Sequence, residues 1–395
     1  MSGCRVYFSE SMKSYSVCSL LLLIITASGC SAQRNKPMFS PAQDGFIKVG
    51  DHPADLVTAD VNKDGKLDLI TANLESKDIT VLLGDGVGGF RQTSGSPFKV
   101  KNPAHHIVAG DLNKDENLDL TLTFHDSYEI MILVGDGKGN FGELKTVVEA
   151  VQAEKAHNHG LALADLNGDK NLDFITSNTG VNSVSVLLGN GKLNFKHSEG
   201  SPFRVGKWPY PLVIADVNRD SYPDILTPNF GGASTSVLFG DGKGNYSSNK
   251  ESIIKVASTP YFLTAGDLNN DQKPDLVTSH NDINTITILL GDGRGGFKPA
   301  SFSPLDVETR VWKIALADLN SDNNNDIILA AQIDNSVIVL LGNGKGNFTP
   351  APGSPYRVGD LPTGLAVGDV NLDGKLDIVT ANARSDNVSV LLNQE

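Results

Sequence analysis

Short apolar runs alternate with turns rich in Gly, Asp and Asn along almost the whole chain. In the first unit of this pattern, an apolar strand at 56–59 leads into an Asp-rich loop, and further strands are expected at 67–71 and 79–83. A more polar strand follows a Gly-rich turn and ends near residue 100. Four short strands in a unit of this length are typical of one blade of a β-propeller.

The strongest repeated signal is the pattern Asp-(Val/Leu)-Asn-x-Asp-x-x-x-Asp. It begins at Asp60, Asp111, Asp165, Asp216, Asp267, Asp318 and Asp369. Successive copies are 51 residues apart, except for one separation of 54. Such a regular register predicts seven units with the same supersecondary structure.

The two ends of the chain complement each other. The last unit stops near residue 392, after its third strand, whereas residues 47–50 precede the first unit and resemble the fourth-strand ends at 203–206 and 356–359. We therefore expect an all-β, seven-bladed β-propeller of four-stranded antiparallel blades, in which the N-terminal strand completes the last blade. An open solenoid, the alternative, would leave both the spare and the missing strand unexplained and two sheet edges exposed.

The first 30 residues have a different pattern. Met12-Lys13 precedes an apolar run at 20–25, which is too short for a mature membrane span and has the length of a signal-peptide core. We predict a signal peptide over 1–29, with translation starting at Met12. Ala27-Ser28-Gly29-Cys30 resembles the bacterial lipobox, with Ala in place of its usual Leu, and this resemblance implies lipidation of Cys30. An ordinary secretion signal is the alternative.

Residues 30–43 are polar, and they are expected to form a flexible tether to a propeller that covers 44–395. All three cysteines lie within the first 30 residues, which excludes a disulfide framework in the body. The formal net charge of −13 argues against a nucleic-acid partner. We expect a monomer in the bacterial cell envelope, lipid-anchored at the outer membrane or cell surface rather than the inner membrane, or otherwise secreted or periplasmic.

Each Asp-rich loop concentrates oxygen ligands. Positions one, five and nine are Asp, position three is Asn, and a backbone carbonyl at position seven can add another donor. Ca²⁺ takes six to eight oxygens in flexible geometry, whereas Mg²⁺ keeps its waters and zinc prefers Cys or His, which no loop contains. The loops hold 21 of the 46 acidic residues, so bound Ca²⁺ would offset the negative charge.

We therefore expect up to seven Ca²⁺ sites of structural type, although solvated Asx turns without metal are the alternative. The expected ligands are Asp60, Asn62, Asp64, Asp68, Asp111, Asn113, Asp115, Asp119, Asp165, Asn167, Asp169, Asp173, Asp216, Asn218, Asp220, Asp224, Asp267, Asn269, Asp271, Asp275, Asp318, Asn320, Asp322, Asp326, Asp369, Asn371, Asp373 and Asp377. Gly65 and Gly374 occupy position six, where a sharp turn is needed. The sixth loop carries Asn325 at position eight, and we expect it to be the weakest site.

These units resemble FG-GAP/VCBS-type repeats, which build the seven-bladed propeller of integrin α chains. The Asp-rich loop and the turn Gly-Asp-Gly-x-Gly-x-Phe carry the resemblance, which covers roughly 44–395. It implies that each Asp-rich loop joins the first and second strands of a blade and holds Ca²⁺. The turns at 84–89 and 291–296 also satisfy the string G-x-G-x-x-G, but a strand follows them instead of the helix that a dinucleotide site requires.

A second register varies while the scaffold repeats. Six and eight residues before each Asp-rich loop, the chain places both tryptophans, four of the eight histidines, two tyrosines and one arginine. Loops that enter the innermost strands meet at one mouth of a propeller channel, so these residues are expected to line a concave pocket. The candidate ligand-binding residues are His105, His157, His159, Trp208, Tyr210, Tyr261, Arg310 and Trp312. The alternative is that they only plug the channel.

Three functions remain open from the sequence. The first is an adhesion or recognition module that binds a glycan or a protein, with calcium as scaffold. The second is a polysaccharide lyase or hydrolase using His157, His159 and Arg310; against it, the chain has no G-x-S-x-G and no H-E-x-x-H motif. The third is a scaffold within an envelope complex.

Overall fold

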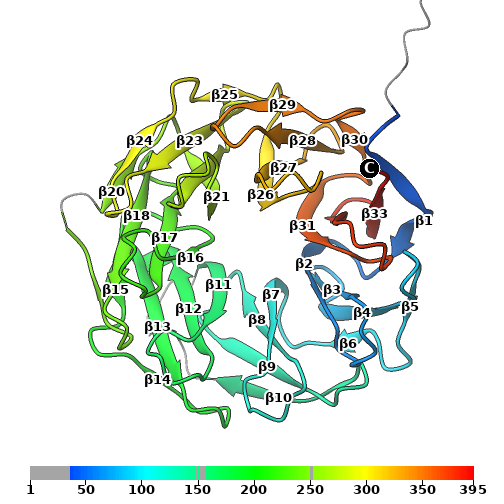
Figure 1. The fold of residues 1–395 in the computed structure, drawn as a ribbon. Helices are drawn as coiled ribbons and strands as arrows, with labels where there is room; N and C mark the ends of the chain where they lie inside the picture. Colours follow the sequence, from blue (N-terminus) through cyan, green and yellow to red (C-terminus); the bar gives the residue numbers. More distant parts are fainter. Residues whose placement is uncertain (1–35, 148–149, 152–156, 250–251) are drawn as a thin grey trace, which may run out of the picture. The chain divides into compact units, whose positions relative to one another are not determined.

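The computed structural model describes residues 36–147, 150–151, 157–249 and 252–395. In this part of the chain seven antiparallel sheets follow one another around a ring, as Figure 1 shows. The predicted all-β, seven-bladed propeller is therefore confirmed. The signal peptide predicted over 1–29 and the lipidation predicted at Cys30 lie outside the described residues.

Each blade runs from an inner to an outer strand. The innermost strands are β2 (Pro53–Ala59), β7 (Ala104–Gly110), β11 (Asn158–Ala164), β16 (Val213–Ala215), β21 (Pro260–Gly266), β26 (Val311–Ala317) and β31 (Pro362–Gly368). The second strands are β3 (Asp68–Asn73), β8 (Asp119–Phe124), β12 (Asp173–Asn178), β17 (Asp224–Asn229), β22 (Asp275–His280), β27 (Asp326–Ala331) and β32 (Asp377–Asn382). The third strands are β4 (Asp78–Gly84), β9 (Ile130–Gly135), β13 (Ser183–Gly189), β18 (Ser234–Gly240), β23 (Thr285–Gly291), β28 (Ser336–Gly342) and β33 (Asn387–Asn393).

The outer strand is more irregular than the sequence pattern indicates. Most blades split it into two short pieces that both pair with the third strand: β5 (Phe90–Gln92) with β6 (Phe98–Lys99), β14 (Phe195–His197) with β15 (Phe203–Arg204), β19 (Tyr246–Ser247) with β20 (Ile253–Lys255), β24 (Phe297–Pro299) with β25 (Leu305–Asp306), and β29 (Phe348–Pro350) with β30 (Tyr356–Arg357). The second blade has β10 (Phe141–Val147), and a short 3₁₀ helix, η1 (Thr179–Val181), precedes β13. These outer pieces are largely exposed.

The core lies between blades because the middle strands are apolar on both faces. All six residues of each second strand are buried. Successive side chains of a strand point to opposite faces. Leu69 therefore packs against the last blade while its neighbour Ile70 packs against the second. This explains why apolar residues occupy consecutive positions in these strands, as Leu69 and Ile70 do.

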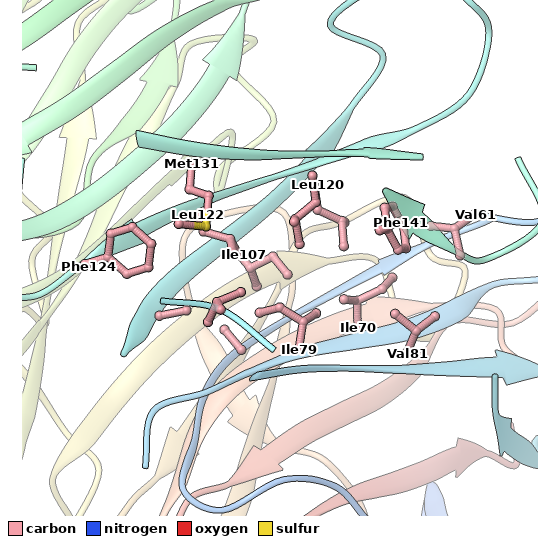
Figure 2. Close-up of a cluster of buried hydrophobic side chains, with 14 of the residues drawn as sticks. Val61, Ile70, Ile79, Val81, Ile107, Leu120, Leu122, Phe124, Met131 and Phe141 are labelled. Carbon is pink, nitrogen blue, oxygen red and sulfur yellow. The ribbon is translucent and has the colours of Figure 1, made fainter. Parts of the chain in front are cut away.

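Figure 2 shows the cluster between the first and second blades. Ile70, Ile79 and Val81 come from one blade, and Leu120 and Leu122 come from the next. All five side chains are fully buried. Comparable clusters occupy the other interfaces between adjacent blades, including the one between the last blade and the first. Burial of this kind contributes roughly 25 cal/mol per Å² of apolar surface, so blade-to-blade packing stabilises the ring.

The ring closes as predicted, but its closing strand begins earlier than expected. β1 (Phe39–Lys48) pairs antiparallel with β33, with Ile47 opposite Val388 and Phe39 opposite Asn393. Met38 and Phe39 are buried between the sixth and seventh blades. The boundary at 43/44 between tether and propeller is therefore wrong, because the apolar side chains of these residues find a partner surface that the local sequence does not reveal.

The Gly-rich turns are hairpins. The amide of Asp85 donates to the carbonyl of Gly89, and β5 follows the turn, so the chain continues as a strand and not as a helix. This confirms that the G-x-G-x-x-G string here is a turn signature. Among the described residues, no helix has the length and apolar character that a membrane crossing requires.

Candidate functional site

The two candidate regions lie at opposite ends of the innermost strands. In the second blade, β7 has His105 near its start and ends just before the Asp-rich loop that begins at Asp111. A strand of this length spans roughly 20 Å. The Asp-rich loops and the aromatic mouth are therefore separate sites, joined only through the rigid blades.

In the first Asp-rich loop, the side-chain oxygens are held by backbone amides of the same loop. Asp60 accepts hydrogen bonds from the amides of Asp64 and Gly65, at 3.2 and 2.9 Å. Asn62 accepts a bond from the amide of Asp64, and Asp64 accepts one from the amide of Lys66. The loop thus fixes its carboxylates in place by a compact network of local bonds.

The ninth residue of the loop ties it to the blade. Asp68 accepts hydrogen bonds from the amides of Val61 and Gly84, both at 2.9 Å. Burial and then the nearby carboxylates of Asp64 and Asp60 raise its pKa to about 6, although the two backbone bonds lower it. The pKa of the equivalent Asp is raised in every other blade as well. Each loop therefore concentrates negative charge that a cation would relieve.

The same backbone conformation recurs in all seven loops. Position six has a positive φ throughout, whether it is a glycine (Gly65, 81°) or another residue such as Lys170 (64°) or Asn323 (63°). The interpretation of position six as a sharp turn is correct. The hydrogen-bond network of the sixth loop matches that of the first, since Asp318 accepts bonds from the amides of Asp322 and Asn323. Asn325 in that loop donates to the carbonyl of Asp267 in the neighbouring loop.

The donor set fits a hard cation. Each loop presents carboxylate and amide oxygens with no nitrogen or sulfur ligand, on a turn that its own backbone stabilises. In the first loop, Asp60, Asn62, Asp64 and Asp68 would hold a Ca²⁺ ion. Such an ion would supply charge neutralisation and would keep the loop closed.

At the other end, the mouth residues share an unusual backbone feature. In the inner strands the register with the second strand shifts around His105, His159, Tyr261 and Trp312. A β-bulge of this kind redirects a side chain and ends regular pairing locally. Tyr210 lies in an equivalent break between the isolated bridge of Pro209 and the start of β16. The bulges explain why one sequence register lines the channel mouth in blade after blade.

These side chains form one continuous series of ring contacts. His159 stacks on Tyr210, with centroids 4.1 Å apart, and Tyr210 meets Tyr261 edge-on at 5.2 Å. Tyr261 then packs against Trp312 at 4.2 Å. Tyr261 is buried and Trp312 is half-buried, so the deeper part of the series also fills the channel.

An aromatic groove opens beside this series. It has a volume of about 340 Å³ and is lined by His157, Thr179, Gly180, Trp208, Tyr210 and Phe230. Phe230 stacks on Tyr210 with centroids 4.4 Å apart, and the indole of Trp208 lies 6.4 Å from Phe230 in a near-parallel arrangement. Trp208 is 44% exposed and has a φ of 57°, a conformation that L-residues seldom adopt.

The structure brings together seven of the eight residues proposed from the sequence. The exception is Arg310, whose side chain is exposed and takes part in none of the ring or hydrogen-bond contacts found in the described chain. Three residues of the mouth were missed: His106, His125 and Phe230. His106 is the residue after a bulge, while His125 and Phe230 follow the second strand of their blades. The loop after the second strand varies in sequence from blade to blade, and this variation could have identified His125 and Phe230.

The asparagines that end several second strands are structural. Asn73 is fully buried and donates to Asp78 and Thr80, at 2.9 Å each. Asn229 donates in the same way to Ser234 and Ser236. These asparagines therefore join the second and third strands of a blade.

Charge at the mouth is concentrated on one buried carboxylate. Burial would raise the pKa of Asp55, but the ammonium of Lys313 and the ring of His106 outweigh it and hold this pKa well below its usual range. Lys313 forms an ion pair with Asp55, and His106 Nδ1 lies 3.4 Å from its other oxygen. Burial, followed by neighbouring imidazoles, holds the pKa of His159 well below its ordinary value. The mouth thus combines the ionised carboxylate of Asp55 with the neutral imidazole of His159.

The repeats match the family model of the FG-GAP-like repeat at 60–122, 165–227, 267–329 and 318–380. These segments cover more than half of the chain, and the protein belongs to this family of seven-bladed propellers. The sequence has no match among curated proteins.

Several solved structures share the fold. BBS1N, solved in complex with ARL6DN, is similar with a TM-score of 0.64 and 11% identity, over 91% of this chain and 98% of that one. A lectin from Agrocybe aegerita that recognises non-reducing terminal N-acetylglucosamine has a TM-score of 0.56 and 18% identity, over 84% and 86%. Virginiamycin B lyase from Staphylococcus aureus, solved with quinupristin, has a TM-score of 0.55 and 13% identity, over 91% and 99%. At such identities the likeness shows the fold alone.

Proposed function

We propose that this protein is a calcium-stabilised recognition module that binds a glycan in the aromatic groove. The observation that carries the proposal is the exposed indole of Trp208 beside a hollow of about 340 Å³ that Tyr210 and Phe230 also line. Ring faces of Trp and Tyr stack on the apolar faces of sugar rings, while their polar atoms and neighbouring groups accept or donate hydrogen bonds.

A fixed backbone turn presents the indole of Trp208 at the groove. The amide of Trp208 donates to the side chain of Asn182 at 2.8 Å, which helps to hold the residue in a left-handed conformation. The same conformation and the same kind of amide bond recur at His52 and Leu361, so this turn belongs to the repeat, and in this blade it carries an exposed indole. The ammonium of Lys207 lies 4.6 Å from the centre of the Trp208 ring and provides a cation at the rim.

Calcium has a structural role in this proposal. The Asp-rich loops would hold up to seven Ca²⁺ ions at the end of the blades away from the groove, where they would fix the inner strand against the second strand of each blade. The ions would contribute to stability by mass action, since the folded loops assemble ligands that the unfolded chain does not. The groove itself needs no metal for stacking.

The expected location is the bacterial cell envelope, with a lipid on Cys30 as the anchor. Localisation at the outer membrane or cell surface would place the groove in contact with external glycans. A protein ligand is a second possibility for the same surface, since the propeller BBS1N was solved with a protein partner. A polysaccharide-acting enzyme and an envelope-complex scaffold would use the same fold.

A glycan array probed with the full-length protein in excess Ca²⁺ tests the proposal. We expect selective binding, weakened about thirtyfold or more in Trp208→Ala, which corresponds to a loss of ~2 kcal/mol. Phe46→Ala is the matched control, because Phe46 is an exposed aromatic on the outer strand β1, away from the groove. Equal binding by wild type and Trp208→Ala would contradict the proposed site. Release of products from a bound polysaccharide would instead indicate an enzyme, and co-purification of an envelope complex without glycan binding would indicate a scaffold.

A further inference from the structure

Five of the eight histidines of the chain meet at the mouth of the second and third blades. This histidine cluster consists of His105, His106, His125, His157 and His159. Adjacent rings have centroids between 4.2 and 5.6 Å apart. The Nε2 atoms of His157 and His159 are 2.8 Å apart. Nothing in the stacking role of the groove requires so many imidazoles in one place.

Two sets of three histidines could each hold a metal ion, and His159 belongs to both. The inner set is His105, His106 and His159, and the outer set is His125, His157 and His159. Within each set, the possible ligand atoms all lie within 4.8 Å of one another. Ligands about 2.0–2.1 Å from a tetrahedral zinc ion are a little more than ~3 Å apart, so small side-chain rotations would complete either set.

The inner set contains buried imidazole nitrogens that make no hydrogen bond. His105 Nδ1 and His106 Nε2 are buried, and neither atom has a hydrogen-bond partner. Leaving a buried polar atom unpaired costs roughly 1–3 kcal/mol, so two such atoms on adjacent residues call for an explanation. A bound metal ion would satisfy both.

A carboxylate orients one member of the inner set. His106 Nδ1 lies 3.4 Å from Asp55 Oδ2, and Asp55 is itself held by Lys313. An Nδ1–H donated to the carboxylate leaves Nε2 as the lone-pair atom, and this is the nitrogen that has no other partner. Metal-binding histidines commonly donate their second nitrogen to a carboxylate in this way, which fixes the tautomer and increases ligand basicity.

A small cavity lies next to the inner set. It has a volume of about 70 Å³, and its lining includes all three histidines together with Asp55, Tyr261 and Trp312. This volume leaves room for a metal-bound water or a small ligand atom. Three imidazoles with an open fourth position form the arrangement found at catalytic zinc centres, whereas closed structural sites use four protein ligands.

We propose that His105, His106 and His159 bind one divalent transition-metal ion of the zinc class, with Asp55 as the carboxylate that positions His106. Imidazole nitrogens suit zinc, copper, nickel and iron, while calcium and magnesium require oxygen ligands. The site is therefore chemically distinct from the Asp-rich loops. It can be tested separately from glycan binding, because the metal ion has its own spectrum, even though His159 also stacks on Tyr210 beside the groove.

The test uses the full-length protein with Ca²⁺ in large excess, so that the Asp-rich loops do not compete for the probe. Co²⁺ is titrated and followed by its visible d–d absorption, and Zn²⁺ is then added to displace it. We expect one equivalent of Co²⁺ to bind with a spectrum of low coordination number, and Zn²⁺ to abolish this spectrum. Absence of a stoichiometric Co²⁺ spectrum in the wild-type protein would overturn the proposal without any variant.

Variants then identify the ligands. His106→Ala should abolish the spectrum, and Asp55→Asn should weaken metal affinity by about 10–100-fold. The control is His197→Ala, because His197 is exposed on β14 and contacts Ser201 outside the cluster. Loss of the spectrum in His125→Ala with full retention in His106→Ala would overturn the assignment to the inner set. The Ca²⁺-bound melting transition of each variant shows whether it is folded, and Asp55→Asn provides a milder change if His106→Ala is not.

Discussion

The imidazole of His159 stacks on the ring of Tyr210, with centroids 4.1 Å apart and planes inclined by 28°. This contact crosses from the third blade to the fourth, and it joins the histidine cluster to the aromatic groove. His159 lies in a bulge of its inner strand, while Tyr210 precedes a shortened one. The histidine cluster and the aromatic groove therefore share one wall. A substitution of His159 or Tyr210 should alter both sites.

The two tryptophans of the mouth should respond differently to truncation. Trp208 is exposed at the groove, whereas Trp312 is half-buried against Tyr261. We expect Trp208→Ala to leave the melting temperature nearly unchanged, and Trp312→Ala to destabilise the fold by about 2 kcal/mol or more through lost packing. Thermal melts in Ca²⁺ measure both. Comparable destabilisation by Trp208→Ala would mean that both rings are channel plugs.

Removal of calcium should destabilise the propeller. Chelation should lower the melting temperature, and Ca²⁺ should restore it more fully than Mg²⁺, because only Ca²⁺ suits an all-protein oxygen cage. Each site at a hundredfold excess over its Kd contributes about 2.7 kcal/mol. Scanning fluorimetry and metal analysis provide the measurements. Fewer than about three Ca²⁺ ions per chain would disprove a seven-site propeller.

Replacing a non-glycine residue at position six of an Asp-rich loop by glycine should raise the stability of the protein. Ser221 occupies this position with a φ of 72°, a conformation that costs an L-residue roughly 1–2 kcal/mol. Ser221→Gly should therefore raise the stability of the calcium-free protein by about 0.5–1 kcal/mol after the entropic cost of glycine. The control is Ser247→Gly, in strand β19, where the same replacement should destabilise. Equal effects of the two changes would show that the loop conformation is not strained.

A loop with glycine at position six should lose more Ca²⁺-dependent stability when one of its ligands is removed. Gly374 adopts the left-handed conformation freely, whereas Asn323 in the sixth loop does not. We expect Asp64→Ala and Asp373→Ala to reduce Ca²⁺-dependent stability more than Asp322→Ala does. Melting temperatures at saturating Ca²⁺ rank the three variants. A larger loss for Asp322→Ala would instead indicate that the sixth loop depends more on its metal site than the bond from Asn325 to Asp267 can offset.

The buried His280 should make stability depend on pH. It replaces the Asn that ends several other second strands, and its Nε2 lies 2.8 Å from Thr287 Oγ1. Burial lowers its pKa below the ordinary value of 6.5, so below that pH the unfolded chain binds a proton that the folded chain resists. The stability of the wild type should therefore fall as the pH drops through this range, more steeply than that of His280→Asn. Melts between about pH 5 and 8 at saturating Ca²⁺ compare the slopes, and identical slopes would contradict the expectation.

We predict that a lipid on Cys30, the last cysteine in the chain, anchors the protein. Cys30→Ser should release the protein from membranes into the soluble fraction, because no other residue of the mature chain could carry the lipid thioether. Fractionation of cells and mass spectrometry of the mature N-terminus test this. A wild-type protein that is already soluble and begins at another residue would rule out the lipid.

Much of the fold follows from local chemistry that repeats along the chain. The Asp-rich loops, the Gly-rich turns and the apolar middle strands each depend on residues within one blade, so the seven blades and their closure by residues near Ile47 could be predicted. The mouth register was found for the same reason: His105, Trp208 and Trp312 vary against a constant background.

Only the tertiary structure decided how blades meet. Phe39 belongs to the closing strand because its side chain fits between the sixth and seventh blades, against a surface made by residues 315–391. His106 joins His159 because bulges redirect the side chains of two inner strands, and a bulge is a property of strand register that no single segment encodes. Arg310 shares the register of Trp208 in sequence, yet its side chain is exposed and joins none of the ring contacts among the described residues.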